Sequence, residues 1–305
     1  MLSVSFAQLT FTNRTTAEGL GSNVVLGVFA EGGRVFAATA RGLAISTDGG
    51  ATFTNRTTAE GLGDNVVFGV FVEGSTVYAA TFSGLTISTD AGATFTNRTT
   101  AEGLGNNYLL SVFAEGSRVY AATNGGGLAI STDGGATFTT RTTAEGLGSN
   151  VVFGVFVESS TVYVATNGGL AISTDAGTTF TNRTTAEGLG DDSVQGVFAE
   201  GSTVYAATNG DGLAISTDGG TTFTNRTTAE GLEDNFVRGV FAQDSTVYAA
   251  TFGGGLAIST DGGATFTTTT TAEGLGSNVV RGVFVEGSTV YVATNGGGLS
   301  ISRIP

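Results

Sequence analysis

The chain has 305 residues, of which 40% are apolar, and a formal net charge of −14. It has no cysteine, histidine or tryptophan, and all 12 of its basic residues are arginine, which excludes structural zinc sites, Cys or His catalysis and lysine Schiff bases. The acidic balance argues against nucleic acid or anionic lipid as a partner, and no apolar run is long enough to span a membrane. We expect no metal and no cofactor.

The N-terminal segment MLSVSFAQLTF (Met1–Phe11) has no basic region followed by a continuous apolar stretch, so no signal peptide is predicted. It runs into LTFTNRT (Leu9–Thr15), which has the composition of the strand that closes every later repeat.

A motif phenylalanine recurs every 42 or 43 residues, at Phe11, Phe53, Phe95, Phe138, Phe180, Phe223 and Phe266. The extra residue always falls at one point, as in NGGGL (Asn124–Leu128) against NGGL (Asn167–Leu170). Insertions confined to one point mark a loop. A period of roughly 40–45 residues is typical of a β-propeller blade of four strands.

Each repeat divides into four short segments rich in β-branched or aromatic residues and bounded by Gly, Asn, Asp or Ser. We name them strands a to d; examples are Val24–Gly32 for a, Thr76–Thr81 for b, Gly42–Thr47 for c and Ala51–Thr57 for d. No window shows helical periodicity of useful length. The fold class is therefore all-β.

The chain starts with a lone d-type strand and stops after a c-type strand, Gly298–Ser302. The N-terminal strand would complete the last blade and remove a free sheet edge, which predicts a closed, monomeric propeller of seven four-stranded antiparallel blades. An open solenoid and a domain-swapped oligomer of fewer blades are the alternatives. The predicted segments are 1–15 (outer strand of blade 7), 16–57, 58–99, 100–142, 143–184, 185–227 and 228–270 (blades 1 to 6), and 271–305 (rest of blade 7).

The c–d turn reads STDGGATF at Ser46–Phe53, and the pattern S-x-D-x-G-x-T-F begins again at Ser88, Ser131, Ser173, Ser216 and Ser259. It resembles the Asp-box, or bacterial neuraminidase repeat. That resemblance implies that the aspartate accepts backbone N–H bonds in a tight turn and is not catalytic. A catalytic group is needed once, whereas a structural clip is needed in every blade. The aspartates are Asp48, Asp90, Asp133, Asp175, Asp218 and Asp261.

The rest of the unit, Gly19–Ile45, resembles the propeller repeat of two-component regulator sensors, which implies an extracytoplasmic or secreted location.

Sialidases also carry Asp-boxes, so a glycoside hydrolase is an alternative function. Such an enzyme needs a converging arginine triad, a Tyr–Glu pair and an acid/base Asp. Six arginines here occupy one repeated outer-strand position and are expected to point from the rim: Arg14, Arg56, Arg98, Arg141, Arg183 and Arg226. We therefore predict no catalytic residue.

The d–a and b–c loops should share one face of the ring, with the aspartate turns on the opposite face. Two repeated polar positions lie near that face. The first comprises Asn23, Asn65, Asn107, Asn150, Asp192, Asn235 and Asn278; it is either a ligand-binding polar mouth or, as we favour, a set of turn caps. The second comprises Glu18, Glu60, Glu102, Glu145, Glu187, Glu230 and Glu273. It is an acidic collar that attracts cations, or a set of glutamates that are either solvated or paired with the nearby arginine, as Glu18 would be with Arg14.

The third residue of strand a is the least symmetric position: Leu26, Phe68, Leu110, Phe153, Gln195, Arg238 and Arg281. With Arg41 in a b–c loop, Arg238 and Arg281 would make three cations on adjacent blades, suited to an amphipathic or acidic ligand. The alternative is a rim position that tolerates substitution. Phe82 and Phe252 in b–c loops could stack on a sugar ring.

These features favour a non-enzymatic binding or scaffold propeller that contacts a glycan or a protein through the face of the d–a and b–c loops. Near-identical blades would give several weak, equivalent sites and hence avidity. Copies this similar also fit recent amplification or engineering of one blade, in which case no ligand need exist.

Overall fold

The computed structural model of the chain describes residues 9–304. The first eight residues of the segment 1–15, including most of the segment considered for a signal peptide, lie outside the described residues, as does residue 305.

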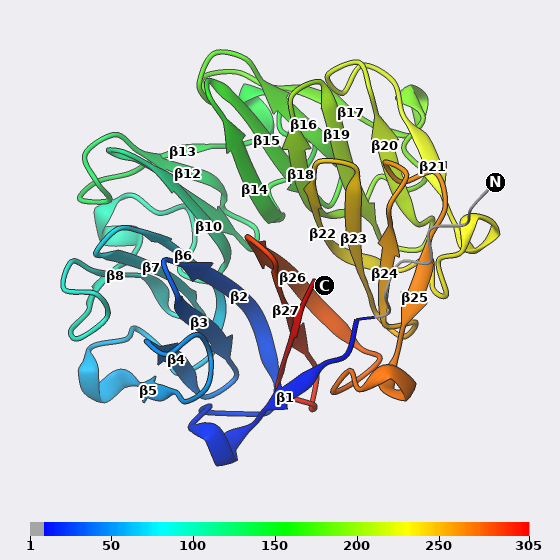
Figure 1. Cartoon of the computed structure of the whole chain (residues 1–305). Coiled ribbons are helices and arrows are strands. Elements are labelled where there is room, and N and C mark those ends of the chain that lie inside the picture. The colour runs from blue at the N-terminus through cyan, green and yellow to red at the C-terminus, as the bar shows by residue number, and fades with distance from the viewer. Residues whose placement is uncertain (1–8, 305) are drawn as a thin grey trace.

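Seven four-stranded antiparallel sheets surround a central axis (Figure 1). Strand a of blades 1 to 7 is β2 (Val25–Glu31), β6 (Val67–Glu73), β10 (Leu109–Glu115), β14 (Val152–Glu158), β18 (Val194–Glu200), β22 (Val237–Gln243) and β26 (Val280–Glu286). Strand b is β3 (Arg34–Thr39), β7 (Thr76–Thr81), β11 (Arg118–Thr123), β15 (Thr161–Thr166), β19 (Thr203–Thr208), β23 (Thr246–Thr251) and β27 (Thr289–Thr294). Strand c is β4 (Gly42–Ser46), β8 (Gly84–Ser88), β12 (Gly127–Ser131), β16 (Gly169–Ser173), β20 (Leu213–Ser216), β24 (Leu256–Ser259) and β28 (Leu299–Arg303). Strand d is β5 (Thr54–Arg56), β9 (Thr96–Arg98), β13 (Thr139–Arg141), β17 (Thr181–Arg183), β21 (Thr224–Arg226), β25 (Thr267–Thr269) and, in blade 7, β1 (Thr12–Arg14).

The ring closes in blade 7, where β1 pairs antiparallel with β28 and Thr12 lies opposite Ile301. The predicted closed seven-bladed propeller is confirmed, and the open solenoid is wrong.

The outer strands are shorter than expected: β5 starts at Thr54 rather than Ala51, because Ala51 and Thr52 belong to the turn held by Asp48.

The hydrophobic core lies between neighbouring blades. Phe36 and Ile45 of blade 1, for example, pack with Val70 and Val72 of blade 2. One phenylalanine from each strand a also forms a closed aromatic belt around the axis, with neighbouring ring centroids 4.6 to 5.6 Å apart. The belt comprises Phe29, Phe71, Phe113, Phe156, Phe198, Phe241 and Phe284. Tilted ring pairs add to the stabilisation from apolar burial.

A one-turn 3-10 helix starts every d–a connection, although no helix was predicted. The seven are η1 (Thr16–Glu18), η2 (Thr58–Glu60), η3 (Thr100–Glu102), η4 (Thr143–Glu145), η5 (Thr185–Glu187), η6 (Thr228–Glu230) and η7 (Thr271–Glu273). Each has a capping box: the Thr15 side chain accepts from Ala17 N, and Glu18 Oε2 accepts from Thr15 N at 2.7 Å. Glu18 thus caps its own helix and forms no direct ion pair with Arg14, although the charge of Arg14 contributes to lowering the Glu18 pKa.

The repeated outer-strand arginines reach the aspartate turn of the next blade instead of pointing away from the rim. Arg56 Nε in blade 1 donates to the Gly92 carbonyl in blade 2 at 2.9 Å. The same bond follows Arg14, Arg98, Arg141, Arg183 and Arg226, at 2.7 to 3.0 Å. In blade 6 this position is Thr269, and its neighbour, blade 7, has no c–d turn because β28 and β1 come from distant parts of the chain. The six arginines match the six turns.

Candidate functional site

A β-bulge in strand a of every blade positions the candidate site. In blade 1 the pairing register shifts between Val25 and Gly27, which leaves Leu26 without an opposite residue. The same shift occurs in the other six blades. A bulge re-aims its side chain, and the seven bulged residues together line one cavity of about 190 Å³. We call it the mouth: Leu26, Phe68, Leu110, Phe153, Gln195, Arg238 and Arg281.

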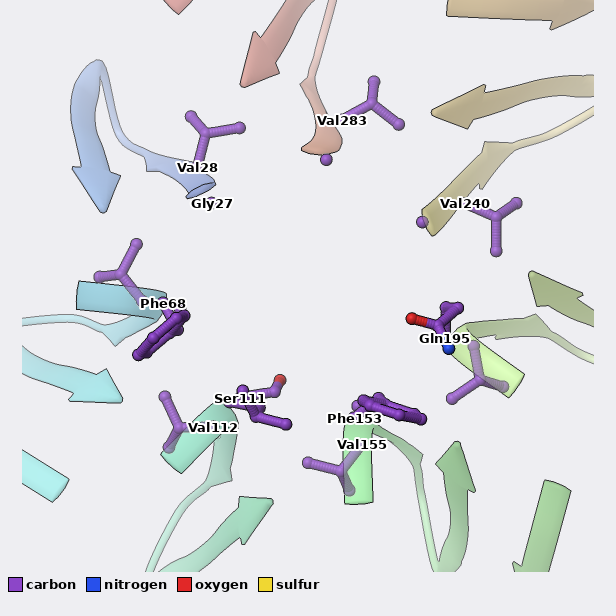
Figure 2. Close-up of a pocket in the computed structure, with 18 residues that line it drawn as sticks. Gly27, Val28, Phe68, Ser111, Val112, Phe153, Val155, Gln195, Val240 and Val283 are labelled. Atoms are coloured by element: carbon purple, nitrogen blue, oxygen red, sulfur yellow. The ribbon is translucent and has the colours of Figure 1, made fainter. Parts of the chain in front are cut away.

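A second cavity, of about 250 Å³, shares four of the mouth residues. The residue after each bulge lines it, and this residue is glycine in six blades and Ser111 in blade 3. We call this part of the channel the neck: Gly27, Gly69, Ser111, Gly154, Gly196, Gly239 and Gly282. Figure 2 shows Phe68, Ser111, Phe153 and Gln195 around an open centre, while Val28, Val240 and Val283 point away from it.

The mouth has an apolar sector that continues onto the exposed face of the ring. The Phe68 ring contacts Tyr108 at 5.0 Å between centroids, and Tyr108 contacts Phe82 at 4.7 Å. Phe82 is 51% exposed. These three rings give blades 2 and 3 a continuous aromatic surface beside the mouth.

The opposite sector is cationic. The guanidinium carbon of Arg238 lies 4.7 Å from the ring centroids of both Phe236 and Phe252, and that of Arg281 lies 5.9 Å from Phe252. Arg281 also donates to Asn295 Oδ1 at a long 3.4 Å. The Nε atoms of both arginines are buried and have no hydrogen-bond partner. Phe252, for which we predicted stacking on a sugar ring, lies against the guanidinium groups of both arginines and is 38% exposed.

Neither mouth arginine forms an ion pair with an acidic side chain among residues 9–304, where the ion pair found joins Arg34 to Glu31. Burial lowers the pKa of both guanidinium groups, and the charge of Arg281 lowers the pKa of Arg238 further. Burial and like charge both disfavour the charged form. The two sites therefore hold positive charge that the described residues do not compensate.

Two other predicted members of the site have different surroundings. Arg41 is exposed in the b–c loop of blade 1 and is not among the residues that line the mouth. Gln195 lines the mouth, and its amide donates to Ser193 Oγ at 3.1 Å, which in turn donates to Asn167 Oδ1. The structure thus brings together two of the three predicted cations.

The residue at the repeated asparagine position stabilises the d–a connection through hydrogen bonds. Asn23 Oδ1 accepts from Thr16 N of η1 at 2.9 Å, and the other six members, including Asp192, make the equivalent bond at 2.7 to 3.0 Å. The backbone carbonyls of Asn150, Asn235, Asn278 and Asn23 also accept from glycine N–H groups in the b–c loop of the preceding blade. Those four loops are the ones with the extra residue. The preferred interpretation as turn caps agrees with these bonds.

Each turn aspartate holds its own turn. Asp48 Oδ1 accepts from Ser46 Oγ at 2.7 Å and from the backbone N–H groups of Ala51 and Thr52, and Oδ2 accepts from Thr52 Oγ1 at 2.7 Å. The other five aspartates repeat this set. These bonds lower the carboxyl pKa well below its usual range, to about 2 for Asp261. An ionised carboxylate that accepts this set of hydrogen bonds stabilises its turn and is not a proton donor.

Within residues 9–304, no group of three or more acidic side chains is arranged to hold a metal ion. Of the helices in the same range, none has the length and apolar character needed to cross a membrane.

No family model and no curated protein matches the chain. Among solved structures, it is similar to the extracellular domain of BT3049 from B. thetaiotaomicron, described as a hybrid two-component system, with a TM-score of 0.80 and 17% identity over 98% of this chain and 42% of that one. YCF48, solved bound to a D1 peptide, has a TM-score of 0.71 and 16% identity over 99% and 97%. The GH74 enzyme of Niastella koreensis has a TM-score of 0.67 and 24% identity over 94% and 44%.

These similarities show the propeller fold and do not extend to function. The chain spans about two fifths of the length of the first two extracellular domains it resembles. Similar structures include extracellular domains of two-component systems, a peptide-bound protein and an enzyme, so the function has to be argued from the mouth itself.

Proposed function

We propose that the chain is a non-enzymatic binding propeller that holds an anionic ligand at the mouth. The observation that supports this most directly is the pair Arg238 and Arg281, whose buried Nε atoms are unpaired in a protein of net charge −14. A buried donor without a partner costs about 1–3 kcal/mol, and an anion in the mouth, which both residues line, would compensate the charge of both guanidinium groups. The seven bulged residues converge on one axis, so we propose one ligand for each ring.

The lining supports binding and not hydrolysis. Glycoside hydrolysis usually requires two carboxyl groups on either side of the scissile bond, and no Asp or Glu is among the residues that line the mouth or the neck. An acidic glycan or an acidic protein segment would use the arginines, whereas a neutral ligand would leave them unpaired. The Asp-box relationship and an extracytoplasmic location form part of the proposal; they are supported by the turn motif and by the similar extracellular domains.

The test is stabilisation by anions in matched variants. The mouth variant Arg238→Leu/Arg281→Leu removes two charges at a position where blades 1 and 3 already have leucine, so it should fold. The control Arg41→Leu/Arg303→Leu removes two exposed charges outside the mouth. Because a ligand that binds only the folded state raises the unfolding temperature, glucuronate and acetate should stabilise the wild type and the control but not the mouth variant. Glucose should have no such effect. Equal shifts in all three proteins would overturn the proposal.

A further inference from the structure

We propose that the mouth and neck together bind a small carboxylate with a compact apolar body, the carboxylate on Arg238 and Arg281 and the body in the neck. This inference rests on the proposed function and adds the chemical class of the ligand.

The arginines favour a carboxylate. Both residues line the mouth from neighbouring blades, and both guanidinium groups lie near the Phe252 ring. A guanidinium is a planar fork of donors that matches a carboxylate in a bidentate geometry. The Nε donor of each fork is the buried, unpaired one, and the aromatic contacts of Arg238 with Phe236 and Phe252 use none of its donors.

The neck has an apolar sector, formed by Phe68, Leu110 and Phe153, against which the apolar body can pack. The rest of its wall is mostly backbone, because glycine follows the bulge in six blades, and it leaves room beside that sector. A Cβ added to Gly282 would meet no heavy atom within 4 Å, and one added to Gly239 would meet its nearest neighbours at 3.8 Å. Phe68 and Phe153 line both cavities, so an apolar surface leads from the mouth into the neck.

The ligand has to be short. The cavities of about 190 and 250 Å³ are each below the roughly 300–1,000 Å³ of sites for drug-sized ligands. A single aryl ring or a short alkyl chain attached to a carboxylate fits this space.

The test compares fluorophenylacetate with acetate and with the neutral fluorophenylacetamide, using fluorine NMR titration and competition. In the wild type we expect fluorophenylacetate to bind at least about 10-fold more tightly than acetate, because the neck removes an aromatic ring from water. The amide should bind about 10-fold or more weakly than the acid, because it makes no charged hydrogen bond.

Two variants separate the parts of the site. Gly239→Val/Gly282→Val fills the neck at positions with room for a side chain and no positive φ; it should remove the advantage of the aryl ring and keep acetate binding. The variant Arg238→Leu/Arg281→Leu should lose both acids by about 10-fold or more. Folding of each variant is checked by its cooperative unfolding.

The outcomes distinguish the two proposals. If acetate binds through the arginines but the aryl ring adds nothing, or if filling the neck leaves fluorophenylacetate binding unchanged, the ligand class is wrong and the anion site stands. If no acid binds in an arginine-dependent way, both proposals are wrong.

Discussion

The bond between an outer-strand arginine and the next blade's turn can be tested by removing one guanidinium. In Arg56→Met the apolar stem is kept, and the 2.9 Å bond from Nε to the carbonyl of the buried Gly92 is lost. Hydrogen bonds that involve a charged group contribute about 1.5–3 kcal/mol. Because Arg56 is only half-buried, we expect the lower end of that range, a loss of about 1.5 kcal/mol in the free energy of unfolding measured by urea titration.

The chain contains its own controls for this experiment. Arg303→Met removes an exposed arginine and should change the free energy of unfolding by less than about 0.5 kcal/mol. Thr269→Arg restores the arginine in blade 6, but Thr269 is 5% exposed and faces a blade without a c–d turn, so it should not stabilise the protein. The reasoning is refuted if Arg56→Met behaves like Arg303→Met, or if Thr269→Arg stabilises as much as Arg56→Met destabilises.

Three further predictions concern the turns and caps. Ala91 and Ala176 occupy the turn with φ of 60° and 59°, where other copies have glycine, so Ala91→Gly should raise the free energy of unfolding by about 1 kcal/mol in urea titration; a loss would contradict the strain. Hydrogen bonds hold the pKa of Asp261 and of Glu18 below the ordinary values of 3.8 and 4.5, so stability should be complete above about pH 5 and fall as the pH drops through the folded-state pKa values. An unchanged urea midpoint from pH 5 to pH 2 would contradict this. Asn65→Ala removes the acceptor for Thr58 N and should cost about 1 kcal/mol in the same titration, whereas a neutral result would exclude a capping role.

The architecture could be predicted because it follows from the spacing of repeated residues along the chain. The recurrence of the motif phenylalanine gave the blade, and the two terminal strand types gave the closure in blade 7. The 3-10 helices were missed because a search for helical periodicity needs a longer window than one turn. A shorter signal was present: Thr15 and Glu18 are spaced as a capping box, and the same T-x-x-E spacing recurs before every strand a.

The residues of the mouth could be predicted only in part from the sequence. The third residue of strand a was correctly grouped, since equivalent positions of a ring meet at its axis. The direction in which this side chain points could not be predicted. The bulge at Leu26 arises from the pairing register between β2 and β3 and not from the conformational preference of the residue itself. Arg41 was grouped with Arg238 and Arg281 because their blades are adjacent, but it lies in an exposed b–c loop and does not line the mouth. The partner of Arg56 lies in another blade, and no pattern within one repeat reveals it.

The asymmetry of the mouth has a stability cost that can be measured. Closure of the ring explains why Thr269 replaces arginine at the outer-strand position of blade 6. It does not explain why polar residues replace apolar ones at the mouth position, because Gln195 and Arg238 lie in blades built from one continuous repeat. Leucine occupies the same position in blades 1 and 3. Arg281→Leu removes the unpaired buried Nε, whose burial costs about 1–3 kcal/mol. It also loses a distant cation–π contact of about 0.5 kcal/mol and the long hydrogen bond to Asn295. We therefore expect Arg281→Leu to unfold at a higher urea concentration than the wild type, by a free energy of about 1 kcal/mol, and to lose stabilisation by acetate. A less stable variant would show that the arginine is retained for the fold, and the argument for a ligand at the mouth would lose its energetic basis.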